Sequence, residues 1–267
     1  MSDLSAFFQP RGIAVIGASR DVNKLGYSLL TKLIDSKYPG EVYPVNPQAD
    51  TILGWKAYPS ILEVPDPLDL AVVIVPAKFV PSVMGECVQR GVPTAVIISG
   101  GFRETGAEGA AREQALAAVI AGQTIRVVGP NCVGVINTHN PPFNATFLEA
   151  MPAEGEIGFL SHSGALCAAV INWARQAGVG FSRIVSLGNQ LDITQTDLLG
   201  TFADDPDTHV ITLYLEGIDD GPAFIQTARQ VAMQLPIVAI KGGTGEAGAR
   251  AVSSHTGALA GQDEAYS

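Results

Sequence analysis

The strongest constraint on the fold is a rhythm of short apolar runs separated by longer stretches of helical spacing. Five such runs occur in the first half of the chain, at residues 13–16, 42–45, 70–75, 95–98 and 125–128. Apolar runs of this length suit strands that are buried on both faces, and their alternation with helical segments is typical of parallel sheets. The pattern therefore predicts an α/β fold built on a doubly wound parallel sheet.

A second cycle of the same kind follows a break in the pattern. Between about residues 138 and 156 the sequence has Pro- and Asn-containing loop chemistry without clear periodicity, which is typical of a connection between domains. The candidate strands that follow are residues 157–160, 184–187, 210–215 and 237–240. We therefore expect two domains, residues 1–145 and residues 146–267, with a smaller flavodoxin-like sheet in the second, which we expect to be incomplete at its C-terminal end.

The composition argues against several classes of protein. A formal net charge of −10 does not suit a general nucleic-acid or acidic-membrane surface, which would need clustered Lys and Arg. No segment reaches ~18 uninterrupted apolar residues, and the first residues lack a basic signal-peptide region. The three cysteines lack metal-ligand spacing and fit a reducing compartment. We expect a cytoplasmic protein without a metal site that binds neither nucleic acid nor a membrane.

Loops at the ends of the first five predicted strands indicate a shared ligand site, because open parallel sheets bind ligands at the carboxyl ends of their strands. Residues 17–26 form a small-residue turn into a helix, where backbone N–H groups can meet a phosphate. The candidate lining residues are Gly17, Ala18, Ser19, Asn46, Val75, Pro76, Ser99, Gly100, Asn131 and Cys132. Each loop taken alone is equally an ordinary turn, and Cys132 is better explained as a small buried thiol than as a nucleophile.

This candidate site lacks the signature of a dinucleotide. The glycine spacing after the first strand is not G-x-G-x-x-G, and the second strand ends at Asn46 where an NAD site usually offers an acidic residue to the ribose. An NAD-linked oxidoreductase is therefore the weaker interpretation.

Two further segments indicate phosphate chemistry. Residues 161–164, Ser-His-Ser-Gly, connect a predicted strand to a predicted helix, so their N–H groups can hold a phosphate. Residues 253–261 place His255 among Ser, Thr and Gly, and a neutral imidazole is a competent nucleophile near pH 7. This combination indicates a phosphohistidine.

The role of His162, inside the loop at residues 161–164, stays open between contact with a phosphate and a place at the loop rim. The acidic pair Asp219 and Asp220 is interpreted as a helix N-terminus rather than a Mg²⁺ site, because carboxylates are favourable there.

The chain resembles NDP-forming acyl-CoA synthetases, of the ADP-forming acetate–CoA ligase type, and the α subunit of succinyl-CoA synthetases. The resemblance covers nearly all 267 residues and rests on motifs in the family's order: residues 13–19, 75–77, 129–132, 161–164, 188–189, 215–217 and 253–261. It implies a Rossmann-like CoA-binding domain followed by a flavodoxin-like succinyl-CoA-ligase domain, both with mainly parallel sheets.

The resemblance also implies a reaction and roles for residues. An acyl-CoA and phosphate give an acyl phosphate and CoA; the acyl phosphate phosphorylates His255, which passes the group to ADP, and all steps are reversible. Glu216, at the end of a predicted strand, would be the second catalytic residue, accepting a hydrogen bond from the other ring nitrogen of His255 and orienting the ring. The phosphate-binding residues would be Ser161, Ser163, Gly164 and Gly257, and the residues that line the first site would bind CoA.

The resemblance implies partners as well. CoA and an organic acid would be substrates, while ATP or ADP and Mg²⁺ would be bound mainly by an ATP-grasp domain or β subunit that these residues do not contain. An oligomer is expected. The identity of the acid, the choice of ADP or GDP, and whether the ATP-grasp part lies in the same chain cannot be read from the sequence. The alternative from another class is a CoA- or nucleotide-sensing regulatory module of a protein acetyltransferase.

Overall fold

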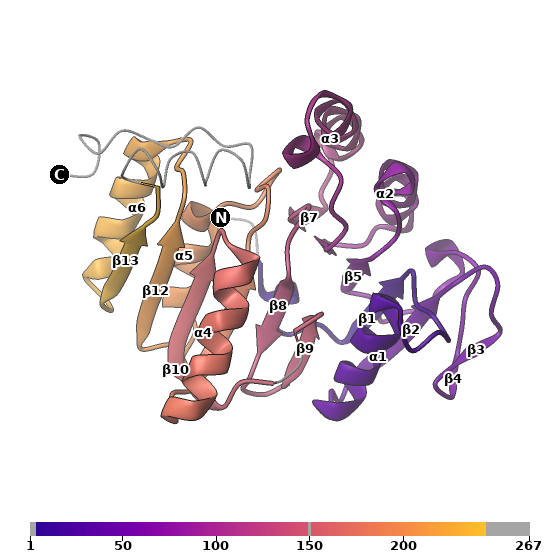
Figure 1. Cartoon of the computed structure of the whole chain (residues 1–267), viewed down its shortest axis with the longest axis horizontal. Helices are drawn as coiled ribbons and strands as arrows, with labels where there is room; N and C mark the ends of the chain where they lie inside the picture. The colour runs from indigo at the N-terminus through magenta and orange to yellow at the C-terminus, as the bar shows by residue number, and fades with distance from the viewer. Residues whose placement is uncertain (1–3, 149–150, 244–267) are drawn as a thin grey trace.

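The computed structural model describes residues 4–148 and 151–243, and within them a five-stranded and a six-stranded sheet dominate (Figure 1). The strands of the first sheet are β1 (Gly12–Ile16), β2 (Glu41–Val45), β5 (Leu70–Val73), β6 (Thr94–Ile97) and β7 (Arg126–Val128). Its helices are α1 (Leu25–Asp35), α2 (Val80–Arg90) and α3 (Ala107–Ile120). All strands of this sheet are parallel, in the order β2-β1-β5-β6-β7, so the predicted doubly wound sheet is confirmed.

Both faces of the first sheet are buried under helices. Ile13 and Val15 of β1 belong to the apolar cluster that contains the buried face of α1. Ala14 and Ile16 belong to the cluster under α2 and α3. Because successive residues of a strand point to opposite faces, a strand covered on both sides needs an unbroken apolar run. This explains why the five runs in the sequence identify the sheet.

Short elements decorate the first sheet. They are the hairpin of β3 (Thr51–Ile52) and β4 (Trp55–Lys56), and the 3-10 turns η1 (Ser5–Phe7), η2 (Ile61–Glu63), η3 (Ala77–Phe79) and η4 (Arg103–Thr105).

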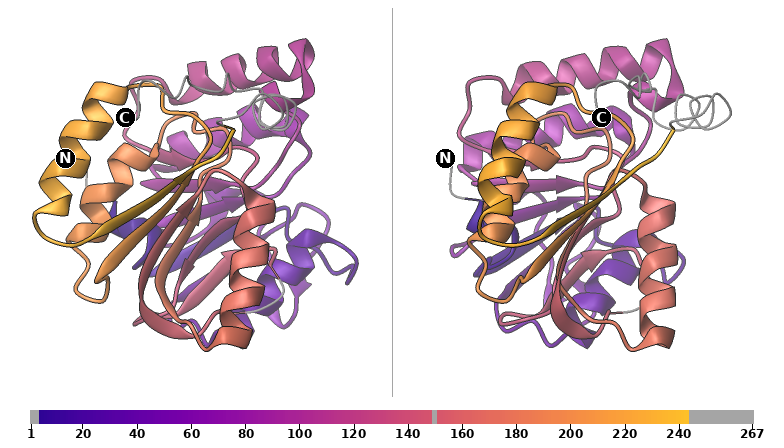
Figure 2. Two further views of the ribbon diagram at one scale, coloured as in Figure 1. Left: turned by 60° about the vertical axis from the view of Figure 1, so that its left-hand side comes forward. Right: turned by 90° about the vertical axis from the view of Figure 1, so that its left-hand side faces the viewer.

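The second sheet repeats the parallel plan. Its parallel strands are β10 (Glu154–Ser161), β11 (Phe181–Ser186), β12 (Val210–Leu215) and β13 (Ile237–Lys241), in the order β13-β12-β10-β11. The helices are α4 (Gly164–Ala177), α5 (Gln195–Ala203) and α6 (Gly221–Ala232). Helix α4 covers one face, and α5 and α6 cover the other (Figure 2). The prediction of two α/β units with mainly parallel sheets is thereby confirmed.

Two strands were not expected from the sequence. Strands β8 (Gly134–Asn137) and β9 (Phe143–Thr146) form an antiparallel pair, and β8 pairs antiparallel with β11. Gly134 has a φ of 120°, and a Cβ there would lie 2.1 Å from the carbonyl oxygen of Ala145, so only glycine fits. Both strands belong to the second sheet although they largely precede residue 146, and the division into residues 1–145 and 146–267 stays a prediction.

The two sheets share one apolar core. Helix α1 packs against β9, and the ring of Tyr38, just after α1, meets Phe143 edge to face at 5.8 Å. Phe8, near the N-terminus, meets Phe202 of α5 in the same way at 5.6 Å. A single buried cluster continues from β1 and α1 through β9 to β10, β11 and β12. The relative position of the two units is therefore fixed by packing, not by a linker alone.

Among the described residues, no helix is long and apolar enough to cross a bilayer. In the same residues, no three His, Cys, Asp or Glu side chains come together as ligands for a metal ion.

Candidate functional site

A cavity of about 1290 Å³, here called the large cavity, opens where the strands of the first sheet end and the second unit begins. Its walls come from the turns after β1, β2, β5 and β6, from the segment after β7, and from the start of α4. All ten residues predicted for the first site line it: Gly17, Ala18, Ser19, Asn46, Val75, Pro76, Ser99, Gly100, Asn131 and Cys132. The expectation that these strand ends converge is confirmed; what they bind is a separate question.

The turn between β1 and α1 fits tightly against its surroundings. Gly17 has a φ of 97°, and a Cβ there would lie 2.6 Å from the carbonyl oxygen of Ile74. A Cβ on Gly26 would lie 2.1 Å from the carbonyl oxygen of Gly17. The two glycines therefore let the first turn of α1 approach the end of β1 closely, where Lys24, Leu25 and Gly26 line the cavity.

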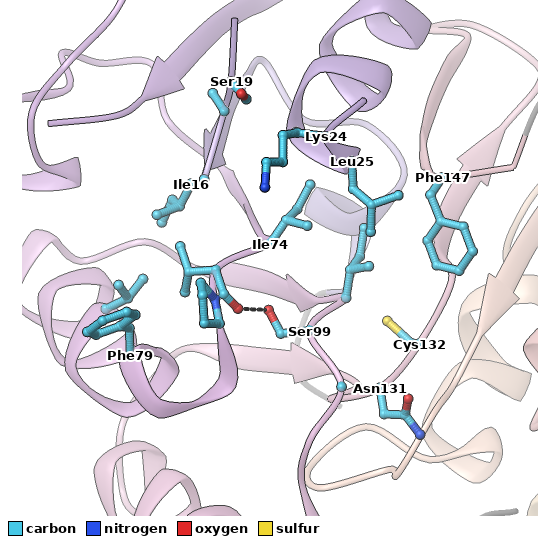
Figure 3. A pocket seen from close by; sticks show the side chains of 18 of the residues that line it. Ile16, Ser19, Lys24, Leu25, Ile74, Phe79, Ser99, Asn131, Cys132 and Phe147 are labelled. Atoms are coloured by element: carbon cyan, nitrogen blue, oxygen red, sulfur yellow. Dashed lines mark hydrogen bonds between the residues drawn. The ribbon is translucent and has the colours of Figure 1, made fainter. Parts of the chain in front are cut away.

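The start of α1 is electropositive. The residue before the helix, Lys24, makes no side-chain cap, so it leaves the first N–H groups of the helix without one. Its side chain points into the large cavity (Figure 3). A helix N-terminus and an ammonium group together favour an anion.

At the end of β2, Asn46 serves the backbone. Its amide nitrogen donates to the carbonyl of Ala18 at 2.7 Å, and its amide oxygen accepts the N–H of Gln48 at 2.7 Å. The side chain thus clamps the β1–α1 turn from the position where a dinucleotide site would present a carboxylate.

The floor of the large cavity is held by hydrogen bonds between strand ends. The Ser99 hydroxyl donates to the carbonyl of Val75 at 2.6 Å, a contact drawn in Figure 3. The N–H of Asn131 donates to the carbonyl of Ser99 at 3.0 Å. The Cys132 thiol lies 3.3 Å from the carbonyl of Ile97, and burial raises its pKa to about 12. This thiol is neutral near pH 7, as expected of a lining group rather than a nucleophile.

The loop before α4 brings only part of the predicted phosphate site to the large cavity. Ser163 and Gly164 line it, whereas Ser161 is fully buried outside the lining. The Ser161 hydroxyl donates to the carbonyl of Ser163 at 2.8 Å and accepts its N–H at 3.1 Å. The Ser163 hydroxyl accepts the N–H of Leu166 and caps the helix. Both hydroxyls therefore already serve the loop itself, and their binding of phosphate stays a prediction.

A second cavity of about 260 Å³, here called the small cavity, lies behind this loop. Glu216 lines it at the end of β12, with only 4% of its surface exposed. Lys241 donates to the backbone carbonyl of Glu216 at 3.1 Å. His162 and Gly188 line both cavities and so form the wall between them.

His162 is a buried neutral imidazole with 5% of its surface exposed. Its Nδ1 accepts the backbone N–H of Glu216 at 3.1 Å, and its Nε2 lies 3.1 Å from the side-chain oxygen of Gln195. Burial lowers the pKa of His162 to about 4; the nearby positive charge of Lys241 lowers it too, while the Gln195 hydrogen bond opposes the shift. Sequence reasoning left this role open between phosphate contact and the loop rim, and the position is neither exposed nor cationic.

Sequence reasoning missed a polar network that joins the two units beside the large cavity. The amide nitrogen of Asn189 donates to Glu104 at 2.9 Å and to Glu113 at 2.7 Å, while its oxygen faces the Asn131 amide at 3.3 Å. The Arg103 guanidinium donates to the Asn189 carbonyl and pairs with Glu113 at 3.3 Å. Burial raises the pKa of Glu104, but the hydrogen bonds from Asn189 and from backbone N–H groups outweigh it and the net shift is downward. The sequence signal that could have pointed to this network is the Gly-Asn pair at residues 188–189, which is one of the motifs of the resemblance.

His255 and Gly257 lie outside the residues that the structure describes. Their predicted roles, and the pairing of His255 with Glu216, are therefore treated as proposals below.

Comparison with known proteins identifies both units. Residues 11–138 match the family model of a CoA binding domain, and residues 154–267 match that of a succinyl-CoA ligase like flavodoxin domain. These two matches follow the order that the motifs predicted.

Curated relatives align along almost the whole chain. The ADP-forming acetate–CoA ligase I of Archaeoglobus fulgidus is 46% identical over 98% of this chain and 38% of its own length. The α subunit of the ADP-forming acetate–CoA ligase II of Pyrococcus furiosus is 44% identical over 98% of this chain and 57% of its own length. The 4-hydroxybutyrate–CoA ligase of Nitrosopumilus maritimus, also ADP-forming, is 40% identical over 98% of this chain and 38% of its own length.

A solved structure agrees with this alignment. The dinucleotide forming acetyl-coenzyme A synthetase 1 of Ca. Korarchaeum cryptofilum, in complex with phosphate and ADP, superposes with a TM-score of 0.94 at 42% identity. The match covers 100% of this chain and 57% of that one. The chain thus spans between about four-tenths and six-tenths of the length of the relatives it matches. With its two domains in this order and this identity to ligases along almost its whole length, the chain belongs to the superfamily of NDP-forming acyl-CoA synthetases and succinyl-CoA synthetase α subunits.

Proposed function

We propose that this chain is the CoA-binding and phosphohistidine-carrying part of an NDP-forming acid–CoA ligase. The reaction is acyl-CoA, phosphate and ADP to acid, CoA and ATP, and it is reversible. The observation that carries the proposal is the convergence of all ten predicted CoA residues on one cavity, in a chain 40–46% identical to ADP-forming acid–CoA ligases.

The large cavity suits CoA chemically. Its electropositive end, formed by Lys24 and the start of α1, would hold phosphate groups of the nucleotide part. The remaining wall is largely apolar, with Leu25, Phe79 and Phe147 among its exposed side chains, and would accept the pantetheine arm. The neutral thiol of Cys132 would stay out of the chemistry.

The phosphoryl relay would run on the side of Glu216. Phosphate attacks the thioester carbonyl, CoA leaves as the thiolate, and an acyl phosphate forms. A ring nitrogen of His255 then attacks the phosphorus, the carboxylate of the acid leaves, and ADP later takes the phosphoryl group. Glu216 would accept a hydrogen bond from the other ring nitrogen and stabilise the cationic phosphorylated ring. Ser161, Ser163, Gly164 and Gly257 are proposed as donors to the phosphoryl oxygens.

The missing half of the reaction implies a partner. ATP or ADP with Mg²⁺ would be bound mainly by an ATP-grasp domain or β subunit, in line with one relative that is about two and a half times as long and another that is itself an α subunit. We also propose that the enzyme is cytoplasmic, which the free buried cysteines fit, and that it is an oligomer, as the family resemblance implies. The protein acetyltransferase alternative is not favoured, because the relatives aligned over 98% of the chain are ligases.

The test is phosphorylation of the whole enzyme, with its ATP-grasp part, by [γ-³²P]ATP. Wild type should take up acid-labile, base-stable label, and His255→Asn should take up none. Equal labelling of the two would refute the relay. Calorimetric titration with CoA, and with NAD as control, tests the large cavity separately; binding of NAD alone would overturn the CoA assignment.

A further inference from the structure

The wall between the two cavities contains a side chain to which the phosphoryl relay assigns no role. His162 and Gly188 are the residues common to the linings of the large and the small cavity. Gly188 is required by space, since a Cβ there would lie 2.3 Å from the carbonyl oxygen of Pro130. No such constraint explains an imidazole at position 162, so its hydrogen bonds are the clue to its role.

These hydrogen bonds fix the tautomer of His162. A backbone N–H can only donate, so Nδ1, which meets the N–H of Glu216 at 3.1 Å, must be the unprotonated acceptor. The ring proton then lies on Nε2 and is donated to the side-chain oxygen of Gln195 at 3.1 Å. Gln195 is itself buried, with 3% of its surface exposed. Both nitrogens are thus committed, and the ring acts neither as a nucleophile nor as a cation.

The contact with Glu216 continues the sheet beyond its last pair of residues. The pairing of β10 with β12 ends at Ser161 and Tyr214, and the N–H of His162 donates to the carbonyl of Tyr214 at 3.1 Å. Two residues further along the chain, the N–H of Glu216 donates to the His162 side chain and not to the backbone of β10. Lys241 donates to the carbonyl of the same residue at 3.1 Å. Both backbone groups of Glu216 are therefore held by side chains.

We propose that His162 is a positioning residue for Glu216. As a neutral imidazole of fixed tautomer it fastens the end of β12 to the loop before α4, and it thereby holds the Glu216 carboxyl group at the wall of the small cavity. This inference rests on the proposed function, in which Glu216 orients His255. It assigns to His162 a role that acts through Glu216 and leaves CoA binding alone.

The test uses the whole enzyme with its ATP-grasp part and three substitutions. His162→Leu keeps bulk but removes the hydrogen bonds of the ring to Glu216 and Gln195, together with the 3.4 Å contact of Nδ1 with the Gln190 amide. His162→Gln restores an acceptor for the Glu216 N–H and a donor for Gln195. Gln195→Met leaves the imidazole in place but removes the partner of its Nε2–H. The readouts are the rate of acid-labile labelling by [γ-³²P]ATP, the CoA dissociation constant and the unfolding midpoint.

Removing a hydrogen bond that leaves a buried donor unsatisfied should slow labelling by about 10- to 100-fold in His162→Leu, with the CoA dissociation constant within about twofold of wild type. His162→Gln should recover the rate to within about threefold, and Gln195→Met should give an intermediate loss of about 3- to 10-fold. Thr208→Val is the matched control for general destabilisation. It removes two buried 2.6 Å hydrogen bonds, to Asp205 and to Ser182, away from both cavities, and should lower the unfolding midpoint without slowing labelling.

Three results would overturn the inference: wild-type labelling rates in His162→Leu, equal losses in His162→Leu and His162→Gln, or a loss that matches weakened CoA binding. If His162→Leu does not fold, an unchanged labelling rate in Gln195→Met overturns it instead. Failure of the proposed function looks different, because then wild type takes up no label or His255→Asn takes up as much as wild type.

Discussion

Two strand-to-helix turns meet at the large cavity, and they use their polar groups in opposite ways. The turn from β1 to α1 leaves the helix without a side-chain cap and turns Lys24 into the cavity. In the turn from β10 to α4, the Ser163 hydroxyl caps the helix, the Ser161 hydroxyl bonds to the loop backbone, and the His162 ring accepts the N–H of Glu216 after β12. The same local motif thus leaves polar groups at the cavity in one case and uses them within the fold in the other.

The largest effect is expected when the turn from β1 to α1 loses its close packing. Gly26→Ala would place a Cβ 2.1 Å from the carbonyl oxygen of Gly17 and push α1 away from β1. We expect CoA binding to become undetectable by calorimetry. Gly85→Ala is the matched control, because it lies within α2 with nothing within 4 Å of the added Cβ, and it should stabilise the fold by roughly 0.5–1 kcal/mol. Normal CoA affinity in Gly26→Ala would show that the first turn is not the ligand site.

The burial of His162 in the second turn should appear in the pH dependence of the unfolding free energy. The pKa of His162 falls from 6.5 to about 4 on folding. Between these two pH values the imidazole is protonated in the unfolded chain and neutral in the folded chain, so acid favours unfolding. At 1.36 kcal/mol per pKa unit, the unfolding free energy should fall by about 3 kcal/mol from this residue alone as pH drops from 7 to 4.

Urea unfolding of wild type and His162→Gln at a series of pH values measures this contribution. The substituted chain should lose less stability in acid, since glutamine does not titrate. Parallel curves for the two proteins would mean that His162 is solvated after all.

The ligand role of the first turn should depend on the charge of Lys24. We expect Lys24→Ala to weaken CoA binding about tenfold at low salt, since one ammonium-to-phosphate contact is removed, and the difference should shrink as salt rises. Lys56→Ala, which removes an exposed lysine outside the cavity lining, is the control. An affinity in Lys24→Ala equal to that of the control at every salt concentration would contradict this expectation.

The smallest effect belongs to Ser163, and it separates the two turns most sharply. As a cap, its hydroxyl should contribute about 1 kcal/mol to the unfolding free energy, so Ser163→Ala should lose this amount in chemical denaturation. CoA affinity should stay within about twofold. If Ser163→Ala instead keeps its stability but loses labelling of His255, the hydroxyl serves the phosphoryl group and the predicted phosphate site is supported.

Much of the fold and of the large cavity could be predicted from the sequence. Buried parallel strands appear in a sequence as apolar runs, and the ends of such strands converge at one edge of the sheet. All nine predicted strands are present, and the ten predicted lining residues meet in one cavity. Strands β8 and β9 escaped because they are four residues each and lie beside the Pro-rich segment. The place of β8 depends on antiparallel pairing with β11, about fifty residues away, and β9 pairs in turn with β8; no local pattern encodes this arrangement.

The network around Asn189 and the role of His162 escaped for a related reason. Asn189 joins side chains from η4 and α3 to the second unit across more than seventy residues of sequence. His162 was visible as a residue beside a possible phosphate site, but its tautomer depends on two partners, Glu216 and Gln195, that only the fold brings to it. Hydrogen-bond partners of this kind are set by tertiary structure, and composition and spacing do not contain them.

The continuous core between the two sheets bears on how such proteins are divided in evolution. Cutting the chain between the units would expose the apolar surface shared by α1, β9 and α5, which water penalises in proportion to area. One relative is a single long protein and another a separate α subunit, yet each aligns with 98% of this chain. In both of these relatives, therefore, the two domains stand together in one polypeptide.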